Sequence, residues 1–190
     1  MSNILNRFKQ QEEIVVTTEK FLSFLIGERH YAFPISEVQE IVEVQEITDV
    51  PEFPYYVKGV INLRGVIIPV ISVRMRFNKP EIEFDDRTCI IVLRTEGVEA
   101  GFIVDTVEEV IDLDKKDISP VPDIMTGTHT RFIDNVGKIG KKIVMLLSAK
   151  RMLTSDEIKS FDVNAAVTKQ SKLDNTDKVL TQLESDLSDD

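Results

Sequence analysis

The sequence is poor in cysteine, histidine, tryptophan and basic residues. Among 190 residues there are one cysteine, two histidines and no tryptophan. Cys89 therefore has no partner for an internal disulfide, which favours a cytoplasmic location. The 23 basic residues are outnumbered by 33 acidic ones, so the formal net charge is −10. The chain has no general positive field, and nucleic acid and anionic membranes are poor default partners.

Long hydrophobic runs are also missing. Apolar stretches such as 66–71 fall far short of the roughly 18 residues that a membrane-spanning helix needs, so we expect no direct membrane insertion. The hydrophobic content of 42% is that of an ordinary globular protein. Composition divides the chain into a flexible N-terminal extension at 1–19, a folded body at 20–161 and an acidic tail at 162–190. The tail carries apolar residues at helical spacing, which predicts a partly helical segment: Val179, Leu180, Leu183 and Leu187.

The body is predicted to be mostly β. Short segments rich in β-branched and aromatic residues alternate with Gly, Pro and Asp, which is typical of a fold built from small strands. The breaks between many of these segments are short, so neighbouring segments should pair as antiparallel hairpins. The breaks are Gly27-Glu28, Arg64-Gly65, Glu96-Gly97 and 137–140. The predicted strands are 20–26, 30–35, 58–63, 66–72, 88–95, 99–105, 106–112, 131–136 and 142–147. So many strands in one body favour closure into two small barrels packed on each other.

Helical patterns in the body are short. Ser36 is a candidate cap for a helix in which Val38, Ile41 and Val44 recur at intervals of three. Thr154 and Glu157 have the spacing of a capping box and predict a second short helix.

No constellation of residues predicts catalysis, a metal site or a cofactor. Glu81, Glu83 and Asp85 alternate and could present carboxylates on one face, but such groups in a loop are usually solvated. Cys89 lies in an apolar run and is expected to be a buried structural thiol. Neither histidine lies near other ligands at metal-binding spacing. We therefore expect a protein that is not an enzyme, with an enzyme using these carboxylates as the weakest alternative.

A basic hairpin leaves one other function open. Lys138, Lys141 and Lys142 surround a glycine-containing turn, and Arg131 lies nearby in the sequence. Such residues on a small β-barrel could bind RNA or another ligand. Because the chain as a whole is acidic, solvated lysines at a tight turn are the simpler interpretation, and the binding function remains the alternative.

The segment 57–77 stands out, because two apolar strands meet at Arg64-Gly65. The turn places the Arg64 guanidinium at the rim of the core. It could form a structural ion pair, extend into solvent, or bind a carboxylate or backbone carbonyl of a partner.

The same segment carries a family resemblance. Gly59-Val60-Ile61-Asn62-Leu63-Arg64-Gly65, followed by Ile68-Pro69-Val70-Ile71, resembles the central signature of the CheW family of chemotaxis coupling proteins. The resemblance extends over residues 20–161. It includes the family's opening hairpin, its short helix at Val38-Gln39-Glu40-Ile41 and a later strand at Gly101-Phe102-Ile103-Val104-Asp105. One departure is Ser72, which stands where the family usually has an acidic residue.

The resemblance implies both a fold and a role. The implied fold is mostly β, with two intertwined five-stranded SH3-like barrels and a few short helices. The implied role is that of a non-enzymatic adaptor that joins the cytoplasmic tips of chemoreceptors to the regulatory domain of the histidine kinase CheA. Other CheW copies in a membrane-associated receptor array are further implied partners, and no cofactor is implied.

The resemblance also implies partner-binding residues. By position they are Val38, Glu40, Ile41, Gly59, Asn62, Leu63 and Arg64. Val38 and Ile41 would supply apolar contact, and Arg64 would fix a polar feature of the receptor. For Gly59 and Leu63, packing within the fold is as good an explanation as contact with a partner.

Overall fold

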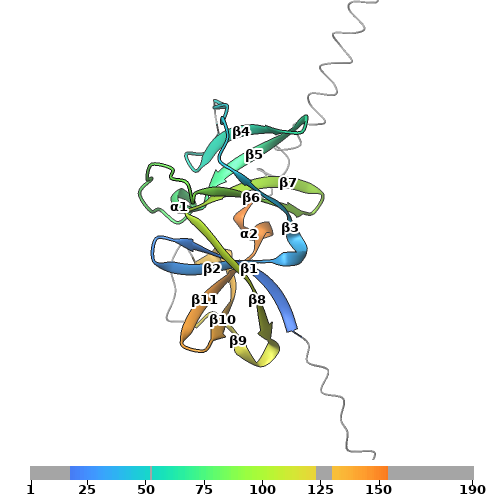
Figure 1. The fold of residues 1–190 in the computed structure, drawn as a ribbon, viewed down its shortest axis with the longest axis vertical. Coiled ribbons are helices and arrows are strands. Elements are labelled where there is room, and N and C mark those ends of the chain that lie inside the picture. Colours follow the sequence, from blue (N-terminus) through green and yellow to red (C-terminus); the bar gives the residue numbers. More distant parts are fainter. Residues whose placement is uncertain (1–17, 52, 123–129, 154–190) are drawn as a thin grey trace, which may run out of the picture.

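The structure is a computed structural model that describes residues 18–51, 53–122 and 130–153. The predicted tail helix and the Thr154 capping box lie outside these residues. The described chain forms eleven strands and five short helical segments (Figure 1). The strands are β1 Thr18–Ile26, β2 Arg29–Pro34, β3 Val38–Glu43, β4 Val57–Leu63, β5 Val66–Ser72, β6 Cys89–Thr95, β7 Val98–Val104, β8 Thr106–Asp114, β9 Ile118–Pro120, β10 Ile133–Ile139 and β11 Lys142–Leu147. The helical segments are η1 Ile35–Glu37, α1 Val73–Arg76, η2 Lys115–Asp117, η4 Thr130–Phe132 and α2 Ala149–Met152.

The strands form two sheets that the chain interleaves. One sheet has the order β8-β1-β2-β11-β10-β9, and the other has the order β3-β6-β7-β5-β4. The chain begins in the first sheet, makes the whole second sheet, and returns to finish the first. The predicted class of two intertwined small β-barrels with short helices is confirmed. The first sheet has six strands rather than five, because the short strand β9 pairs with β10.

The predicted hairpins form at their predicted turns, with one correction. β10 continues through Gly137 to Ile139, so the break at 137–140 shrinks to a tight turn at Gly140, where φ is +58°. A side chain at Gly137 would place its Cβ 2.6 Å from a methyl of Leu113, so this glycine serves packing inside a strand. Two parallel pairings, β2 with β11 and β5 with β7, join segments that are not neighbours in sequence.

The helix predicted from Ser36 is wrong. Only the three residues of η1 are helical there, and Val38–Glu43 form strand β3, which pairs antiparallel with β6. Short stretches of Val and Ile suit both a helix face and a strand, and pairing with another element decides between them. Here the open edge of β6 supplies the hydrogen bonds that fix the strand.

A shared core joins the two sheets. Phe24 and Phe33 from the first sheet stack with ring centroids 5.0 Å apart, and Phe33 contacts Phe102 of the second sheet at 5.4 Å. Met152 of α2 is fully buried in the same cluster. Each such side chain contributes about 1.5–3 kcal/mol by leaving water. Each sheet also encloses a smaller apolar cluster of its own.

Gly59 allows the second sheet to close. Thr48, beyond the end of β3, exchanges two backbone hydrogen bonds of 2.9 Å with Val60 of β4, which links the two edges of the sheet. At Gly59, next to this bridge, φ is +132° and an added Cβ would lie 2.1 Å from the Thr48 carbonyl oxygen. Only glycine permits this approach.

An ion pair fixes the point where the chain passes from one sheet to the other. Asp105 lies between β7 and β8, and its carboxylate receives Nε of Arg74 at 2.7 Å and a second guanidinium nitrogen at 2.8 Å. The backbone N–H of Gly27, in the turn between β1 and β2, donates to the same carboxylate at 2.6 Å. Both charged side chains are only 16% exposed. This pair therefore ties the second sheet to the first hairpin.

Candidate functional site

The turn between β4 and β5 presents Arg64 on the surface. Arg64 and Gly65 have φ values of +53° and +88°, as a two-residue type I′ hairpin turn requires. Asn62 supports the turn, because its side-chain oxygen accepts the Gly65 N–H at 2.8 Å. A left-handed conformation is unfavourable for an arginine by about 1–2 kcal/mol. Glu96, in the turn between β6 and β7, adopts the same conformation with φ of +51°.

Strand β3 brings its residues to the site through an irregularity. Val38 pairs with Leu93, and Glu40 pairs with Val92, so the register shifts between them. Leu93 faces the shared core, whereas Val92 faces the interior of the second barrel. Because paired residues point to the same face, Val38 and Glu40 lie on opposite faces although they are two apart. The spacing alone would have placed them on one face.

Glu40 of the edge strand β3 meets Arg64, which follows the edge strand β4. One guanidinium nitrogen of Arg64 donates to Oε2 of Glu40 at 2.8 Å, and the other donates to Oε1 at 3.3 Å. The Arg64 side chain is 79% exposed and that of Glu40 is 26% exposed. An ion pair as exposed as this contributes about 0–1 kcal/mol. Glu40 therefore orients the guanidinium while leaving most of it open to a second acceptor.

The other predicted site residues divide by burial. Ile41 is 45% exposed and is the apolar surface residue of β3. Val38 is half-buried against the shared core, and Leu63 packs partly on the interior of the second barrel. Asn62 is exposed but supports the turn, and Gly59 is buried beside Thr48. The role of all seven residues in partner binding remains a prediction; Ile41, Asn62 and Arg64 are exposed, and the other four are partly or fully buried.

The sequence did not indicate that Glu40 and Arg64 would pair. The two residues are 24 positions apart, and the predicted helix gave no reason to place Glu40 at the Arg64 turn. Only the strand conformation of β3 and the closure of the sheet bring the carboxylate to the turn.

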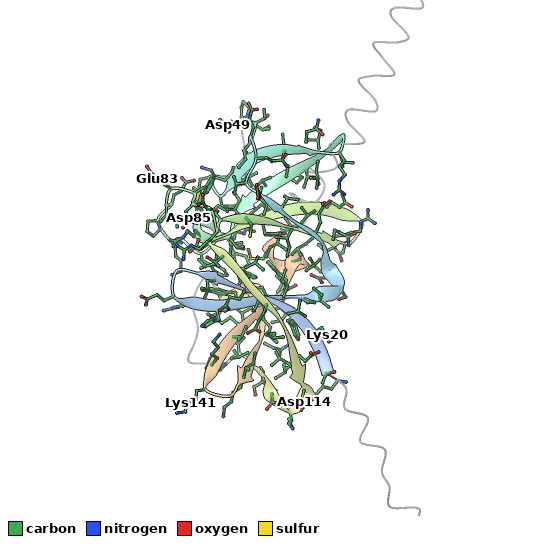
Figure 2. All side chains as sticks on the ribbon, viewed as in Figure 1. Lys20, Asp49, Glu83, Asp85, Asp114 and Lys141 are labelled. Atoms are coloured by element: carbon green, nitrogen blue, oxygen red, sulfur yellow. The ribbon has the colours of Figure 1, made fainter. Side chains whose placement is uncertain are left out.

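Two of the three alternating carboxylates are bound by basic residues. Glu81 is bound by Nζ of Lys58 at 2.6 Å, and Asp85 is bound by Arg87 at 2.8 Å. Hydrogen bonds from the Arg87 side chain and backbone lower the pKa of Asp85 to about 2. A general acid needs a pKa near the working pH, so this carboxyl is shifted in the wrong direction. Figure 2 shows Glu83 and Asp85 on the loop that follows α1.

The basic residues of the alternative function lie on the first barrel. Lys138, Lys141 and Lys142 are exposed at the β10–β11 hairpin, and Figure 2 shows Lys141 at the end of the molecule far from the loop with Glu83. Lys142 is 3.6 Å from a carboxylate oxygen of Glu108. Arg131 stacks over the ring of Phe132 at 4.6 Å, and this contact holds its guanidinium against the barrel.

Within 18–51, 53–122 and 130–153, no group of three or more His, Cys, Asp and Glu side chains is arranged to hold a metal ion. No helix among them has the length and apolar character needed to cross a membrane. Cys89 is half-buried in β6, and burial raises the pKa of its thiol, which disfavours the reactive thiolate.

Comparison with known proteins decides the family. The CheW-like domain matches residues 20–157. The chain belongs to the CheW family of chemotaxis scaffold proteins. Chemotaxis protein CheW of Klebsiella aerogenes is 33% identical over 144 residues, which cover 76% of this chain and 87% of that protein. Chemotaxis protein CheW of Bacillus subtilis is 33% identical over 146 residues, covering 77% and 94%. The crystal structure of the scaffolding protein TtCheW from Thermoanaerobacter tengcongensis has a TM-score of 0.69 and 34% identity, and covers 74% of this chain and 95% of that one.

Within the CheW family, the departure at Ser72 has a local solution. The Ser72 hydroxyl accepts the backbone N–H of Met75 at 3.3 Å and so caps α1 in place of a carboxylate. Arg74 takes its acidic partner, Asp105, from another part of the chain. The helix and the arginine therefore keep their supports without an acidic residue at position 72.

Proposed function

We propose that this CheW-family protein is a non-enzymatic cytoplasmic adaptor that couples the cytoplasmic tips of chemoreceptors to the regulatory domain of the histidine kinase CheA. It acts within membrane-associated receptor arrays, where further copies of the protein are additional partners. The observation that supports this proposal is an exposed guanidinium, Arg64, which is fixed by Glu40 on a strand that also exposes the side chain of Ile41.

Such a surface suits recognition of a folded helical tip. An oriented, exposed arginine suits the centre of an interface, where arginine is enriched. Because the Glu40–Arg64 pair contributes about 1 kcal/mol or less, a partner's acceptor can share or replace Glu40 at little cost. The donors of Arg64 remain oriented, which reduces the entropy lost on binding.

Modest affinity is sufficient for this role. In an array each copy faces several partners at high effective concentration, so weak contacts add up to stable assembly. Signal passes if the adaptor binds one arrangement of receptor and kinase better than another.

The test measures a three-component complex. Receptor cytoplasmic tips displayed on vesicles are sedimented with CheA and this protein, and kinase activity is measured in the same samples. Arg64→Ala is expected to bind receptor at least tenfold more weakly, a loss of about 1.4 kcal/mol or more. Arg94→Ala is the matched control, since Arg94 also pairs with a glutamate, Glu99, at 58% and 26% side-chain exposure.

A charge swap separates the internal pair from the partner contact. Glu40→Arg combined with Arg64→Glu can restore the internal pair but presents the wrong charge to a partner at position 64. We expect the double variant to fold normally and to remain defective in binding. Wild-type binding and coupling by Arg64→Ala or by the swap would contradict the proposed site. Failure of the wild-type protein to enter the complex would contradict the proposed function.

A further inference from the structure

The loop between α1 and β6 is held in place at its beginning. Nζ of Lys58, near the start of β4, lies 2.6 Å from a carboxylate oxygen of Glu81. Arg74 donates a hydrogen bond of 3.1 Å to the backbone carbonyl of Pro80. The first residues of the loop are thus attached both to the second sheet and to the Arg74–Asp105 pair.

The end of the same loop is equally constrained. The Asp85 carboxylate accepts the backbone N–H groups of Arg87 at 3.0 Å and Thr88 at 3.1 Å. The Thr88 hydroxyl accepts the backbone N–H of Asp85 at 3.0 Å. This small closed turn leads directly into β6, so the three residues between the two anchored ends, 82–84, have little freedom.

These three residues alternate like a strand but pair with no strand among the described residues. Ile82 and Phe84 line the same shallow hollow, while Glu83 between them points away from the molecule in Figure 2. Their backbone groups form no hydrogen bond with any residue of the described ranges. Ile82 and Phe84 are each 43% exposed. A fixed, strand-like segment with free backbone groups is the kind of edge to which a further strand can be added.

The charge around this segment indicates which kind of partner it could bind. Four carboxylates lie between Pro80 and Arg87, and Lys58 and Arg87 neutralise Glu81 and Asp85. Glu83 and Asp86 form no ion pair with any described residue. The hollow beneath has a volume of about 10 Å³, enough for a single water molecule and for no organic ligand. The surface therefore suits a polypeptide that carries apolar and basic side chains.

We propose that residues 82–84 bind an extended segment of a partner protein in which apolar residues alternate with lysine or arginine. The partner's backbone pairs with that of Ile82-Glu83-Phe84. Its apolar side chains cover Ile82 and Phe84, and its basic side chains approach Glu83 and Asp86.

This surface is separate from the Glu40–Arg64 site. Lys58 contacts the loop near the start of β4, whereas Arg64 follows the end of that strand, about 20 Å away at 3.3 Å per residue. Figure 1 shows the loop after α1 and the β4–β5 turn at opposite ends of the second sheet. The two surfaces can be occupied together, and the inference does not depend on the proposed function.

The test uses synthetic peptides of defined pattern. An eight-residue peptide of alternating Lys and Val is titrated into the full-length, isotope-labelled protein, and amide resonances are followed. We expect saturable shifts centred on residues 81–85. Peptides of alternating Lys and Ser, alternating Glu and Val, and Lys and Val with methylated backbone nitrogens should each bind at least tenfold more weakly.

Variants of the protein assign the contribution of each feature. Ile82→Ser with Phe84→Ser, and separately Glu83→Lys, should each weaken binding of the Lys-Val peptide at least tenfold. Ile143→Ser is the control, because Ile143 is 52% exposed on the other sheet, and it should bind as the wild type does. Equal binding of the Lys-Ser or methylated peptide, or unchanged binding by the variants, would overturn the proposal. So would self-association of the wild-type protein that the Ile82 and Phe84 variant abolishes, because a second copy would then be the occupant.

Discussion

Replacing Arg74 by alanine tests whether the Arg74–Asp105 pair holds the two sheets together. The substitution removes two charged hydrogen bonds to Asp105, of 2.7 and 2.8 Å, and one of 3.1 Å to the Pro80 carbonyl, and it leaves the Asp105 carboxylate with the Gly27 N–H. Breaking a fully buried ion pair costs about 3–5 kcal/mol. Since both side chains are 16% exposed, water reaches the remaining carboxylate, and we expect a loss of about 2–4 kcal/mol.

The assay is reversible unfolding in urea and by heat. At about 4 °C per kcal/mol for a domain of this size, the midpoint should fall by roughly 10 °C. Lys20→Ala is the control, since Lys20 pairs with Asp112 at 2.6 Å but the side chains are 58% and 52% exposed, and its loss should stay below about 1 kcal/mol. A loss for Arg74→Ala no larger than that of the control would refute the reasoning. A double-mutant cycle with Asp105→Ala then measures the coupling directly.

Three further predictions concern other parts of the molecule. Burial raises the pKa of Glu37 above its ordinary value of 4.5, so the protonated carboxyl stabilises the folded state below pH 4.5 and this stabilisation is lost as pH rises through the folded-state pKa. In urea titrations between pH 4 and 7, Glu37→Gln should reduce this loss of unfolding free energy with pH. An unchanged pH dependence would contradict the prediction. Gly59→Ala should lower the free energy of unfolding by about 3–5 kcal/mol, because the added Cβ would lie 2.1 Å from the Thr48 carbonyl oxygen. Gly97→Ala is the control and should cost about 1 kcal/mol, because nothing lies within 4 Å of its added Cβ. Similar losses for the two variants in thermal unfolding would argue against the clash. Asparagine tolerates the positive φ at position 64, so Arg64→Asn should change the free energy of unfolding by no more than about 1 kcal/mol while receptor binding weakens as in Arg64→Ala. A larger loss of stability would mean that the ion pair with Glu40 holds the hairpin.

Local sequence features were enough to place most strands and their turns. The pairs Arg64-Gly65 and Glu96-Gly97 are short breaks between apolar segments, and each forms a tight hairpin turn. Such turns depend on residues that are adjacent in sequence, and the glycine at the second turn position readily adopts the positive φ that the turn requires. The family resemblance supplies the candidate partner-binding residues, and the structure adds their burial and contacts.

Strand β3 shows where local reasoning failed. The stretch from Val38 to Val44 fits a helix by its spacing, and the register shift near Gln39 puts Val38 and Glu40 on opposite faces. Neither the strand nor the shift can be derived from periodicity, because both arise from pairing with β6, about 50 positions away.

The sequence by itself determined the mostly β class, the hairpin turns and the acidic character, because each depends on composition or on neighbouring residues. The tertiary structure alone decided which charges meet. Arg64 meets Glu40 across the closing edges of one sheet, and Arg74 meets Asp105 where the chain passes to the other. Ion pairs between distant residues follow from how the sheets close and pack, and charge in the sequence does not specify a partner.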